Sequence, residues 1–154
     1  MTRIWAEKGK RTRVVRQQQY LSTYIYGAVC PSEGKAVGLV MPYTNTLSMQ
    51  EHLNEISAQI CPGKHGVVIH DRAGWHIAKD LAVPSNVSLL SLPPYSPELN
   101  PVEQIWQWLR QHFLSNRASE GYEAIVNACC EAWNAFVGTD NLVQTLCSRD
   151  WAFL

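Results

Sequence analysis

Two apolar stretches in the first third of the chain have the composition of β-strands. Residues 20–29 have the sequence YLSTYIYGAV, rich in aromatic and β-branched residues, and residues 35–41 have the sequence KAVGLVM. Such residues favour extended backbone, and the intervening residues 30–34, CPSEG, are typical of a tight turn. The pattern predicts an antiparallel hairpin of two strands.

The apolar positions then change to helical spacing, at Leu47, Leu53, Ile56 and Ile60. Positions three and four residues apart share one side of a helix, so this pattern predicts an amphipathic helix. Thr46 or Ser48 is suited to cap its start, and Pro62 with Gly63 is suited to stop it.

Two short apolar runs follow the expected helix. They are GVVIHD at residues 66–71 and VSLLSL at residues 87–92, and the second run halts at a pair of prolines. Between them, residues 74–84, GWHIAKDLAVP, are long enough for a short helix that returns the chain to the sheet. We therefore predict two parallel strands joined by a crossover.

From Asn100 the apolar positions have helical spacing again, at Val102, Ile105, Trp106, Leu109 and Phe113. Two further helical patterns occupy residues 122–136 and 140–147. Strands first and helices later, with a crossover between them, predict a mixed α/β fold. The chain has 154 residues, of which 46% are hydrophobic, so it can build one domain with a sizeable core over residues 1–154.

The charge of the chain is balanced overall but not along its length. The formal net charge is zero, yet the first 16 residues hold six of the 13 basic residues and a single acid, Glu7. The six are Arg3, Lys8, Lys10, Arg11, Arg13 and Arg16. Clustered Lys and Arg bind nucleic-acid phosphates by releasing counterions, so the segment from Lys8 to Arg13 is a candidate contact to DNA. A solvated loop or an edge strand has the same composition, and the charges leave both interpretations open.

The cysteines are odd in number and fit no metal-binding spacing. They are Cys30, Cys61, Cys129, Cys130 and Cys147. We interpret them as small buried apolar residues in a reducing compartment. The sequence has no run of 18 apolar residues and no signal-peptide pattern, so we expect a cytoplasmic protein without a membrane span.

Two carboxylates are candidates for chemistry. Asp71 stands at the carboxyl end of its predicted strand, where open α/β sheets bind ligands, although an Asp there also starts turns well. Asn100 suits the N-cap of the next helix and Pro101 its first position, so Glu103 fits the third position of a capping box. These local patterns leave open whether each carboxylate is structural or catalytic.

A shared site for the two carboxylates requires neighbouring strands. If the strands that end at Asp71 and Leu92 pair, both carboxylates face one crevice, and a divalent cation turns their repulsion into binding. Oxygen ligands without a cysteine or histidine cluster favour Mg²⁺ or Mn²⁺, the ions of phosphodiester chemistry. His76 is a further candidate contact to substrate, although a histidine there also suits packing or capping. By strand alternation His70 is expected to face the opposite side of the sheet.

The segments VVIHDRAGWHIAKDL and VSLLSLPPYSPELNPVEQIWQWLRQ resemble the endonuclease domain of bacterial insertion-sequence transposases of the mariner superfamily. The resemblance spans about Arg3 to Trp151, and LPPYSPELNPVE is its most specific part. It implies a ribonuclease-H-like fold, with an antiparallel three-strand meander followed by alternating helices and parallel strands. It also implies an Asp, Asp, Glu triad in which Asp71 is the second acid and Glu103 the third, both holding Mg²⁺ or Mn²⁺. The implied partners are the terminal inverted repeats of an element, target DNA and a second copy of the chain.

Two features depart from this family. Arg72 stands where the family usually has Asn, and it would either repel a metal ion or attract phosphate, which makes it another candidate contact to DNA. The first acid of the family lies on a first strand that precedes the segment resembling TRIWAEKGKR, whereas Asp71 is the first aspartate here. Glu7 is expected in a polar loop and Glu33 in a turn, so neither is a convincing first acid.

The expected consequence is an incomplete domain. The first strand is central to the family's sheet, and without it two neighbouring strands would keep unpaired backbone groups. We therefore expect a transposase catalytic domain that is truncated at its amino terminus and inactive alone. The alternative is a non-catalytic remnant of a transposase that binds DNA or another subunit.

Overall fold

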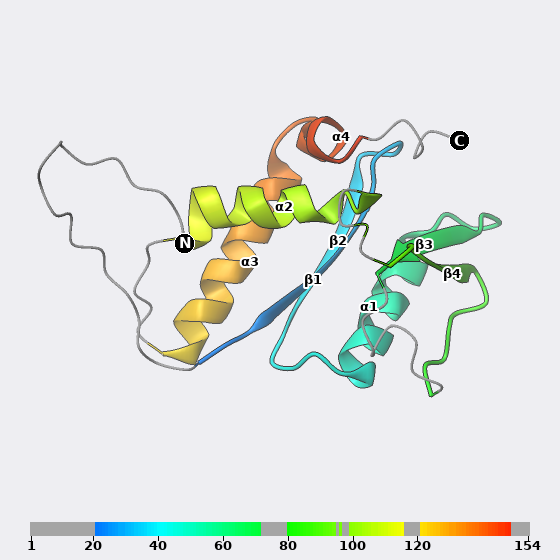
Figure 1. Ribbon diagram of the computed structural model, residues 1–154, viewed down its shortest axis with the longest axis horizontal. Helices are drawn as coiled ribbons and strands as arrows, with labels where there is room; N and C mark the ends of the chain where they lie inside the picture. The colour runs from blue at the N-terminus through cyan, green and yellow to red at the C-terminus, as the bar shows by residue number, and fades with distance from the viewer. Residues whose placement is uncertain (1–20, 72–79, 95, 97–98, 116–120, 149–154) are drawn as a thin grey trace, which may run out of the picture.

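The structure is a computed structural model that describes residues 21–71, 80–94, 96, 99–115 and 121–148. Within these residues the strands occupy the first part of the chain and helices the second, with one helix between the two pairs of strands (Figure 1). In chain order the elements are β1 Tyr24–Cys30, β2 Lys35–Met41, α1 Thr46–Gln59, β3 Gly66–His70, β4 Val87–Ser91, α2 Val102–Leu109, the π-helix η3 Arg110–Leu114, α3 Tyr122–Gly138 and α4 Leu142–Cys147. The predicted mixed α/β fold is confirmed.

β1 and β2 form the predicted antiparallel hairpin, closed by a turn at residues 31–34. Gly27 and Gly38 stand opposite each other in its register. A Cβ added to Gly27 would lie 2.7 Å from Cη2 of Trp133, and one added to Gly38 would also overlap the Trp133 indole. The paired glycines therefore leave room for an aromatic ring that packs directly on the hairpin.

α1 lies close to its predicted bounds, with two differences. Its N-cap is Asn45 rather than Thr46 or Ser48, and Asn45 Oδ1 accepts a hydrogen bond of 2.8 Å from the backbone N of Ser48. Leu47, assigned to the apolar side by its spacing, is 76% exposed. The buried side of the helix is defined by Met49, Leu53 and Ile56. Leu47 stands two residues before Met49, so it points about 200° away on a helix with 3.6 residues per turn.

β3 and β4 are the predicted parallel pair, in a register that runs from Gly66 opposite Val87 to His70 opposite Ser91. The backbone N of Leu92 donates to the carbonyl of His70 at 2.8 Å, so the pairing continues one residue further. The helix predicted at residues 74–84 falls mostly outside the described residues. Residues 80–86 form turns and irregular backbone, and the short helix in this stretch stays a prediction.

The helices form two layers around the hairpin (Figure 1). On one face α1 packs against both strand pairs, through a core of Tyr26, Met49, Leu53, Ile56 and Val87. On the other face α2, α3 and α4 build a second core from Ile105, Leu109, Ala132, Trp133, Phe136, Val143 and Cys147. Every apolar position predicted for the helix after Asn100 belongs to this second core or packs against it, which confirms that amphipathic pattern.

The two strand pairs form two separate sheets in the described part of the chain. One sheet has the order β1–β2 and the other β3–β4, with no ladder between them. Each strand therefore has an edge without a strand partner among the described residues. Edges of apolar strands are templates for pairing with a further strand.

The prediction that all five cysteines are buried is wrong for Cys30 and Cys61, and Cys130 is only half-buried. Cys129 and Cys147 are buried, but Cys30 and Cys61 are exposed, and all five are free thiols. Cys30 ends β1 beside the hairpin turn and Cys61 lies in the connection from α1 to β3, so neither position faces a core. Among the described residues no helix is long and apolar enough to cross a membrane.

Candidate functional site

Asp71 lies directly after β3 and is exposed. The preceding residue, His70, is 7% exposed and places its Nε2 3.4 Å from Oγ of Ser91. The Nδ1 of His70 also forms a hydrogen bond with the backbone carbonyl of Asp71. Side-chain alternation therefore separates the two neighbours as predicted, with His70 buried and Asp71 exposed. Asp71 stands at the carboxyl end of a parallel pair, where open α/β sheets bind ligands.

Glu103 lies in the first turn of α2, and its side chain is exposed. Asn100 Oδ1 accepts a hydrogen bond of 3.2 Å from the backbone N of Val102, and the Asn100 carbonyl accepts one of 3.2 Å from the backbone N of Glu103. Pro101 has helical dihedral angles, φ −63° and ψ −22°, so Asn100 and Pro101 act as the predicted helix start.

The capping box is only half formed. Among the described residues the Glu103 carboxylate makes no hydrogen bond and no ion pair, so the reciprocal bond to the Asn100 backbone is missing. Capping therefore explains Asn100 but not the carboxylate of Glu103. An exposed carboxylate without a partner is available to bind a ligand.

The register of β3 and β4 connects the two carboxylates. Because Leu92 pairs with His70, the chain leaves β4 beside Asp71 and reaches Glu103 eleven residues later. The intervening residues, LPPYSPELNP, hold four prolines, whose fixed φ angles restrict the path. The two strands are thus neighbours, as a shared site requires, and the shared site itself stays a prediction.

A metal site at Asp71 and Glu103 stays a prediction. No group of three or more His, Cys, Asp or Glu side chains within them could hold a metal ion. Two exposed carboxylates still match the oxygen donors that Mg²⁺ and Mn²⁺ prefer. The carboxylates of Asp71 and Glu103 are therefore suitable in chemistry, but the described residues do not add the further side chains that a metal site needs.

The other predicted site residues lie outside the described residues. These are Lys8, Lys10, Arg11, Arg13, Arg72 and His76, together with Glu7. Their roles as contacts to DNA or substrate remain predictions.

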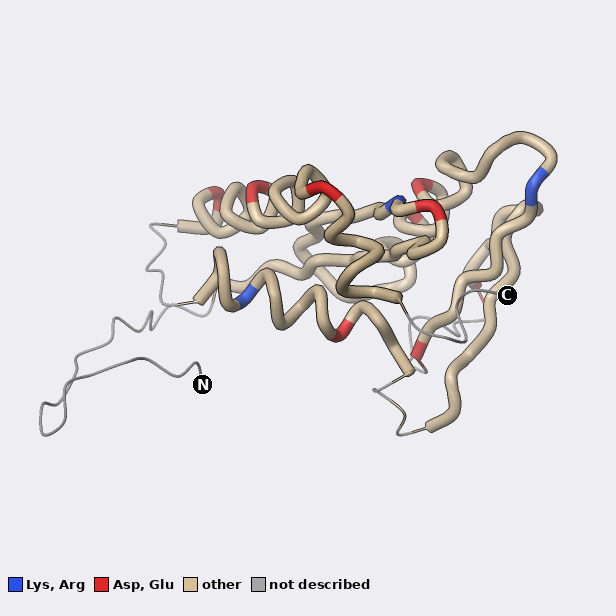
Figure 2. Tube along the Cα trace, turned by 90° about the horizontal axis from the view of Figure 1, so that it is seen from above, with Lys and Arg blue, Asp and Glu red and all other residues tan. Residues whose placement is uncertain are grey.

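Acidic side chains outnumber basic ones in the described part of the chain (Figure 2). The basic residues there are Lys35, Lys64 and Arg110. The acidic residues there are Glu33, Glu51, Glu55, Asp71, Asp80, Glu103, Glu123, Glu131 and Asp140. Such a surface does not attract a polyanion, so electrostatic attraction to DNA depends on basic residues elsewhere in the chain.

Glu33 has a structural role in the hairpin turn. Its carboxylate lies 2.6 Å from Nζ of Lys35 and 3.1 Å from Nζ of Lys64. The hydrogen bond from Lys35, followed by that from Lys64, lowers the pKa of Glu33 below its usual value. A carboxylate held by two lysines is a poor metal ligand, which supports the expectation that Glu33 does not replace the first acid.

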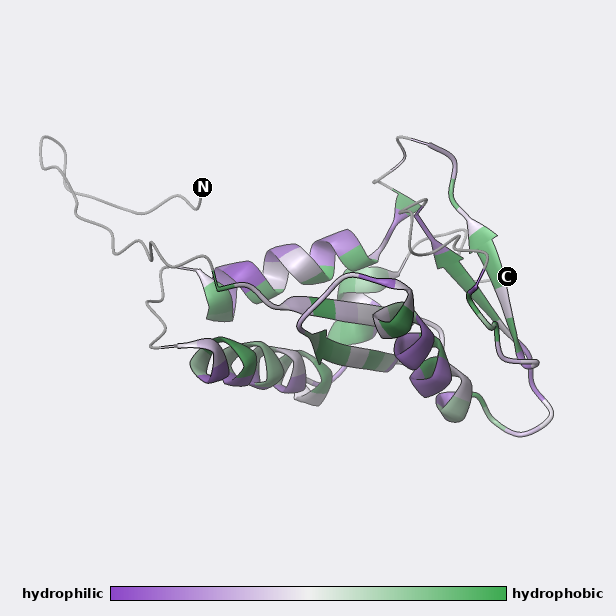
Figure 3. Cartoon of the chain, turned by 90° about the horizontal axis from the view of Figure 1, so that it is seen from below, coloured by the Kyte–Doolittle hydropathy of each residue, from purple (hydrophilic) through white to green (hydrophobic). Residues whose placement is uncertain are grey.

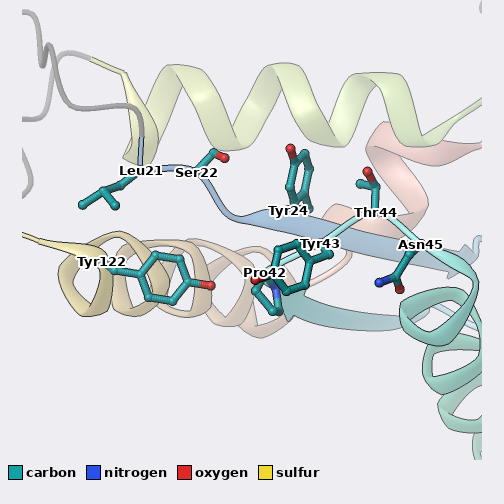
Figure 4. A pocket seen from close by; sticks show the side chains of 8 residues that line it. All are labelled: Leu21, Ser22, Tyr24, Pro42, Tyr43, Thr44, Asn45 and Tyr122. Atoms are coloured by element: carbon teal, nitrogen blue, oxygen red, sulfur yellow. The ribbon is translucent and has the colours of Figure 1, made fainter.

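An open groove at the end of the hairpin was not indicated by any sequence pattern. Tyr24, Tyr43 and Tyr122 line it, from β1, from the connection between β2 and α1, and from the start of α3 (Figure 4). These tyrosines are 19 and 79 residues apart, so only the tertiary structure brings them together. The one available signal is an aromatic residue in the polar loop PYTN at residues 42–45.

Known proteins resemble this chain over most of its length. Residues 1–126 match the family described as DDE superfamily endonuclease, a range that includes Asp71 and Glu103. The chain is 51% identical over 129 residues to the uncharacterized protein y4pE/y4sA of Sinorhizobium fredii (strain NBRC 101917 / NGR234), which covers 84% of this chain and 96% of that protein. No solved structure matches the chain. The chain belongs to the DDE superfamily endonucleases, as the resemblance had implied at this coarser level.

Proposed function

We propose that this chain is the catalytic-domain portion of a mariner-superfamily DNA transposase, which cleaves DNA at insertion-sequence ends and joins those ends to target DNA. One observation carries the proposal. Glu103 lies in the first turn of α2, the helix that follows β4, and its carboxylate has no partner among the described residues. β4 in turn pairs with β3, the strand that Asp71 directly follows. Both acids lie in the part of the chain that matches the DDE superfamily endonucleases.

Asp71 and Glu103 are the proposed ligands of Mg²⁺ or Mn²⁺. Their oxygen donors suit hard divalent cations, which activate the attacking oxygen and stabilise the leaving oxygen in phosphodiester chemistry. The protein contributes the position of each acid. Asp71 is held at the end of a paired strand, and Glu103 is held in a helix turn that Asn100 and Pro101 start.

The third acid is proposed to come from a strand that is not among the described residues. Support comes from the two separate sheets, whose edges can accept a strand, and from the two-acid donor set. On this proposal the chain is inactive without that strand. The assembled enzyme would act in the cytoplasm as a homodimer on terminal inverted repeats and target DNA.

Calorimetry with a nicking assay tests the proposed site. Mg²⁺ and Mn²⁺ are titrated into the chain alone and into a version extended upstream by an Asp-bearing strand, and both are assayed on element-end DNA. We expect the extended version to bind metal and to cut, and we expect Asp71→Asn and Glu103→Gln to abolish both activities. Glu131→Gln, which changes an exposed carboxylate on α3, is the matched control and should leave both unchanged.

Two outcomes would contradict parts of the proposal. Unchanged metal affinity in the Asp71→Asn and Glu103→Gln variants would remove the site assignment. Cleavage by the chain alone would show that another residue acts as the first acid and that no further strand is required.

A non-catalytic remnant that binds DNA or another subunit is the second candidate. The cluster of six basic residues among the first 16 favours it, because phosphate contacts do not require a complete metal site. This candidate predicts salt-sensitive DNA binding that is independent of Mg²⁺. Neutralising Lys8, Lys10, Arg11 and Arg13 together should weaken that binding, and binding that ignores the substitutions would count against it.

A further inference from the structure

We propose that His70 is a positioning residue for Asp71, because its imidazole fixes the backbone of that acid and links it to β4. The inference deepens the proposed function and rests on it, since Asp71 needs positioning only if it is a metal ligand. His70 is the last residue of β3 and is 7% exposed. The ladder of β3 and β4 ends at the pair of His70 and Ser91, one residue before Asp71.

Two contacts of the imidazole join the ends of the two strands. Nδ1 of His70 forms a hydrogen bond with the backbone carbonyl of Asp71, and Nε2 lies 3.4 Å from Oγ of Ser91. The backbone of His70 adds a third link, because its carbonyl accepts a hydrogen bond of 2.8 Å from the backbone N of Leu92. His70 thus contacts Asp71 itself and the start of the segment that leads to Glu103.

The chemistry of the imidazole gives each of its hydrogen bonds a direction. A carbonyl oxygen can only accept, so Nδ1 must carry a proton and donate it to the bond with Asp71. In a neutral imidazole the other nitrogen carries no proton, so the Ser91 hydroxyl donates to Nε2. One ring therefore holds the backbone of Asp71 and the end of β4 at the same time.

The position of His70 would also suit an apolar residue. Val68, two residues earlier and hence on the same side of β3, packs against the core that β3 shares with α1. Burial of an imidazole costs free energy unless its nitrogens are hydrogen-bonded. A leucine would fill such a position without that cost, so packing alone does not explain a histidine. The hydrogen bonds to Asp71 and Ser91 do explain it.

His70 acts on the proposed site through the backbone of Asp71 and not as a ligand. By strand alternation the buried imidazole and the Asp71 side chain lie on opposite sides of the strand. Asp71 stands just beyond the ladder, so the bond from Nδ1 restrains backbone that the strand pairing does not reach. Groups that orient a metal ligand in this way usually contribute about 10- to 100-fold to metal affinity or activity.

NMR of the full chain, labelled with ¹⁵N and kept in EDTA at pH 8, tests the hydrogen bonds without metal or DNA. Correlations between the ring protons and nitrogens show which nitrogen of each histidine is protonated. The His70 signals are identified by their absence in His70→Asn. We expect a proton on Nδ1 of His70. A ring protonated at Nε2 alone would overturn the inference, because it could not donate to the Asp71 carbonyl.

Calorimetry with Mn²⁺, on the upstream-extended version used for the nicking assay, tests the effect on the site. His70→Leu keeps an apolar side chain of suitable size and removes both ring nitrogens. We expect it to weaken Mn²⁺ binding by about 10- to 100-fold. His70→Asn returns a side-chain N–H close to the position of Nδ1 and should recover most of the lost affinity. Rescue by Asn separates the hydrogen bond from packing.

His65→Leu is the matched control. Nε2 of His65 lies 2.9 Å from Oγ of Ser88, so this variant also removes an imidazole–serine bond that links the β3 segment to β4. His65 is exposed and precedes β3, at the opposite end of the strand from Asp71. The substitution should therefore leave Mn²⁺ binding and cleavage unchanged.

The inference is overturned if His70→Leu binds Mn²⁺ like the parent, or if His65→Leu weakens binding equally, because strand pairing would then be the cause. It is also overturned if His70→Asn binds no better than His70→Leu. If His70→Leu does not fold, His70→Asn decides the question against the parent: affinity close to that of the parent supports the inference, and a 10-fold loss overturns it.

Failure of the proposed function gives a different result. If Asp71→Asn binds Mn²⁺ like the parent, the metal site itself is refuted, whatever the His70 variants do. If Asp71→Asn abolishes binding while His70→Leu does not weaken it, the site stands and only the role of His70 is refuted.

Discussion

The two sheets have similar apolar strands but different surroundings. The hairpin of β1 and β2 is covered on both faces, by α1 on one side and by α2, α3 and α4 on the other. The pair of β3 and β4 packs Val68 and Leu89 towards α1, yet Val67 is 60% exposed, Ile69 37% and Leu90 55%. Figure 3 shows the hydrophobic colour of these strands at one end of the molecule.

The difference shows that the composition of a strand does not determine whether helices cover one or both of its faces. Continuous apolar runs are typical of parallel strands buried on both faces, and the runs at residues 66–71 and 87–92 are of that kind. In the described residues only one face of this pair meets a helix. A pair of strands can thus have the composition of a fully buried sheet although, among the described residues, a helix covers only one of its faces.

The largest expected loss of stability follows from a substitution in the core between the β1–β2 hairpin and helices α2, α3 and α4. Phe136 is fully buried and contacts Trp108 and Trp133, with ring centroids 5.8 Å and 5.6 Å away. Phe136→Ala should lower the free energy of unfolding by about 3 to 5 kcal/mol, measured by urea denaturation. Leu90→Ala, on the open face, should cost less than about 0.5 kcal/mol. Equal losses would show that the open face is covered in solution.

A methyl group added between the hairpin and the helices packed on it should lower the free energy of unfolding somewhat less than Phe136→Ala does. Gly27→Ala would place Cβ 2.7 Å from Trp133 and 2.8 Å from Trp106, and neither indole can retreat from the core freely. We expect a loss of about 1 to 3 kcal/mol in the same denaturation experiment. Gly138→Ala, where an added Cβ meets nothing within 4 Å, is the control and should cause no loss. A neutral Gly27→Ala would mean that the hairpin is less tightly covered than described.

The helix shared by the two sheets provides an intermediate test. Asn45 caps α1, so Asn45→Ala should destabilise the chain by about 1 kcal/mol. Both sheets pack on this helix, so hydrogen exchange should increase in β1–β2 and in β3–β4 alike. Asn134→Ala, at an exposed position of α3, should leave exchange unchanged. An increase confined to one sheet would show that the two sheets unfold independently.

The smallest expected effect on stability concerns the ion pair between the hairpin turn and the connection from α1 to β3. Glu33 in the hairpin turn bonds Lys64 in the connection to β3, and its pKa is lowered in the folded state. A lowered pKa contributes stability above the unfolded pKa, and this contribution is lost as the pH falls through the folded pKa. Glu33→Gln should therefore lower the midpoint of thermal unfolding slightly at pH 7 and leave it unchanged near pH 2.

High salt should remove this difference, because the side chains are exposed and screened. Glu131→Gln, at an exposed position in the middle of α3, is the control and should show no such pH dependence. A Glu33→Gln effect that persists at high salt would point to packing rather than charge.

Local patterns predicted the elements because each pattern depends on neighbours in the chain. The hairpin strands, α1 and the helices after Asn100 follow from alternation, helical spacing and turn residues. The N-cap of α1 was predicted wrongly, because Asn45, Thr46 and Ser48 are all good caps and only the backbone conformation chooses among them. Leu47 was assigned to the buried side because spacing alone does not show which residue of the first turn faces the sheet.

The candidate acids were predicted individually, and their relation was predicted only on the condition that the two strands pair. Asp71 at a strand end and Glu103 at a helix start follow from local sequence, and the pairing of Leu92 with His70 needed the register of β3 and β4. The free carboxylate of Glu103 likewise needed the structure, because a capping box and a half-formed one have the same letters.

The sequence by itself determined the class of fold, the order of its elements, the basic cluster near the amino terminus and the two acids in the family motif. Only the tertiary structure decided that the strands form two sheets, that one sheet keeps an apolar face open, and that three distant tyrosines line one groove. The physical reason is the distance along the chain over which each effect acts. Propensity, capping and helical or strand period act over a few residues, whereas coverage and grooves arise from contacts between segments that fold together from distant parts of the chain.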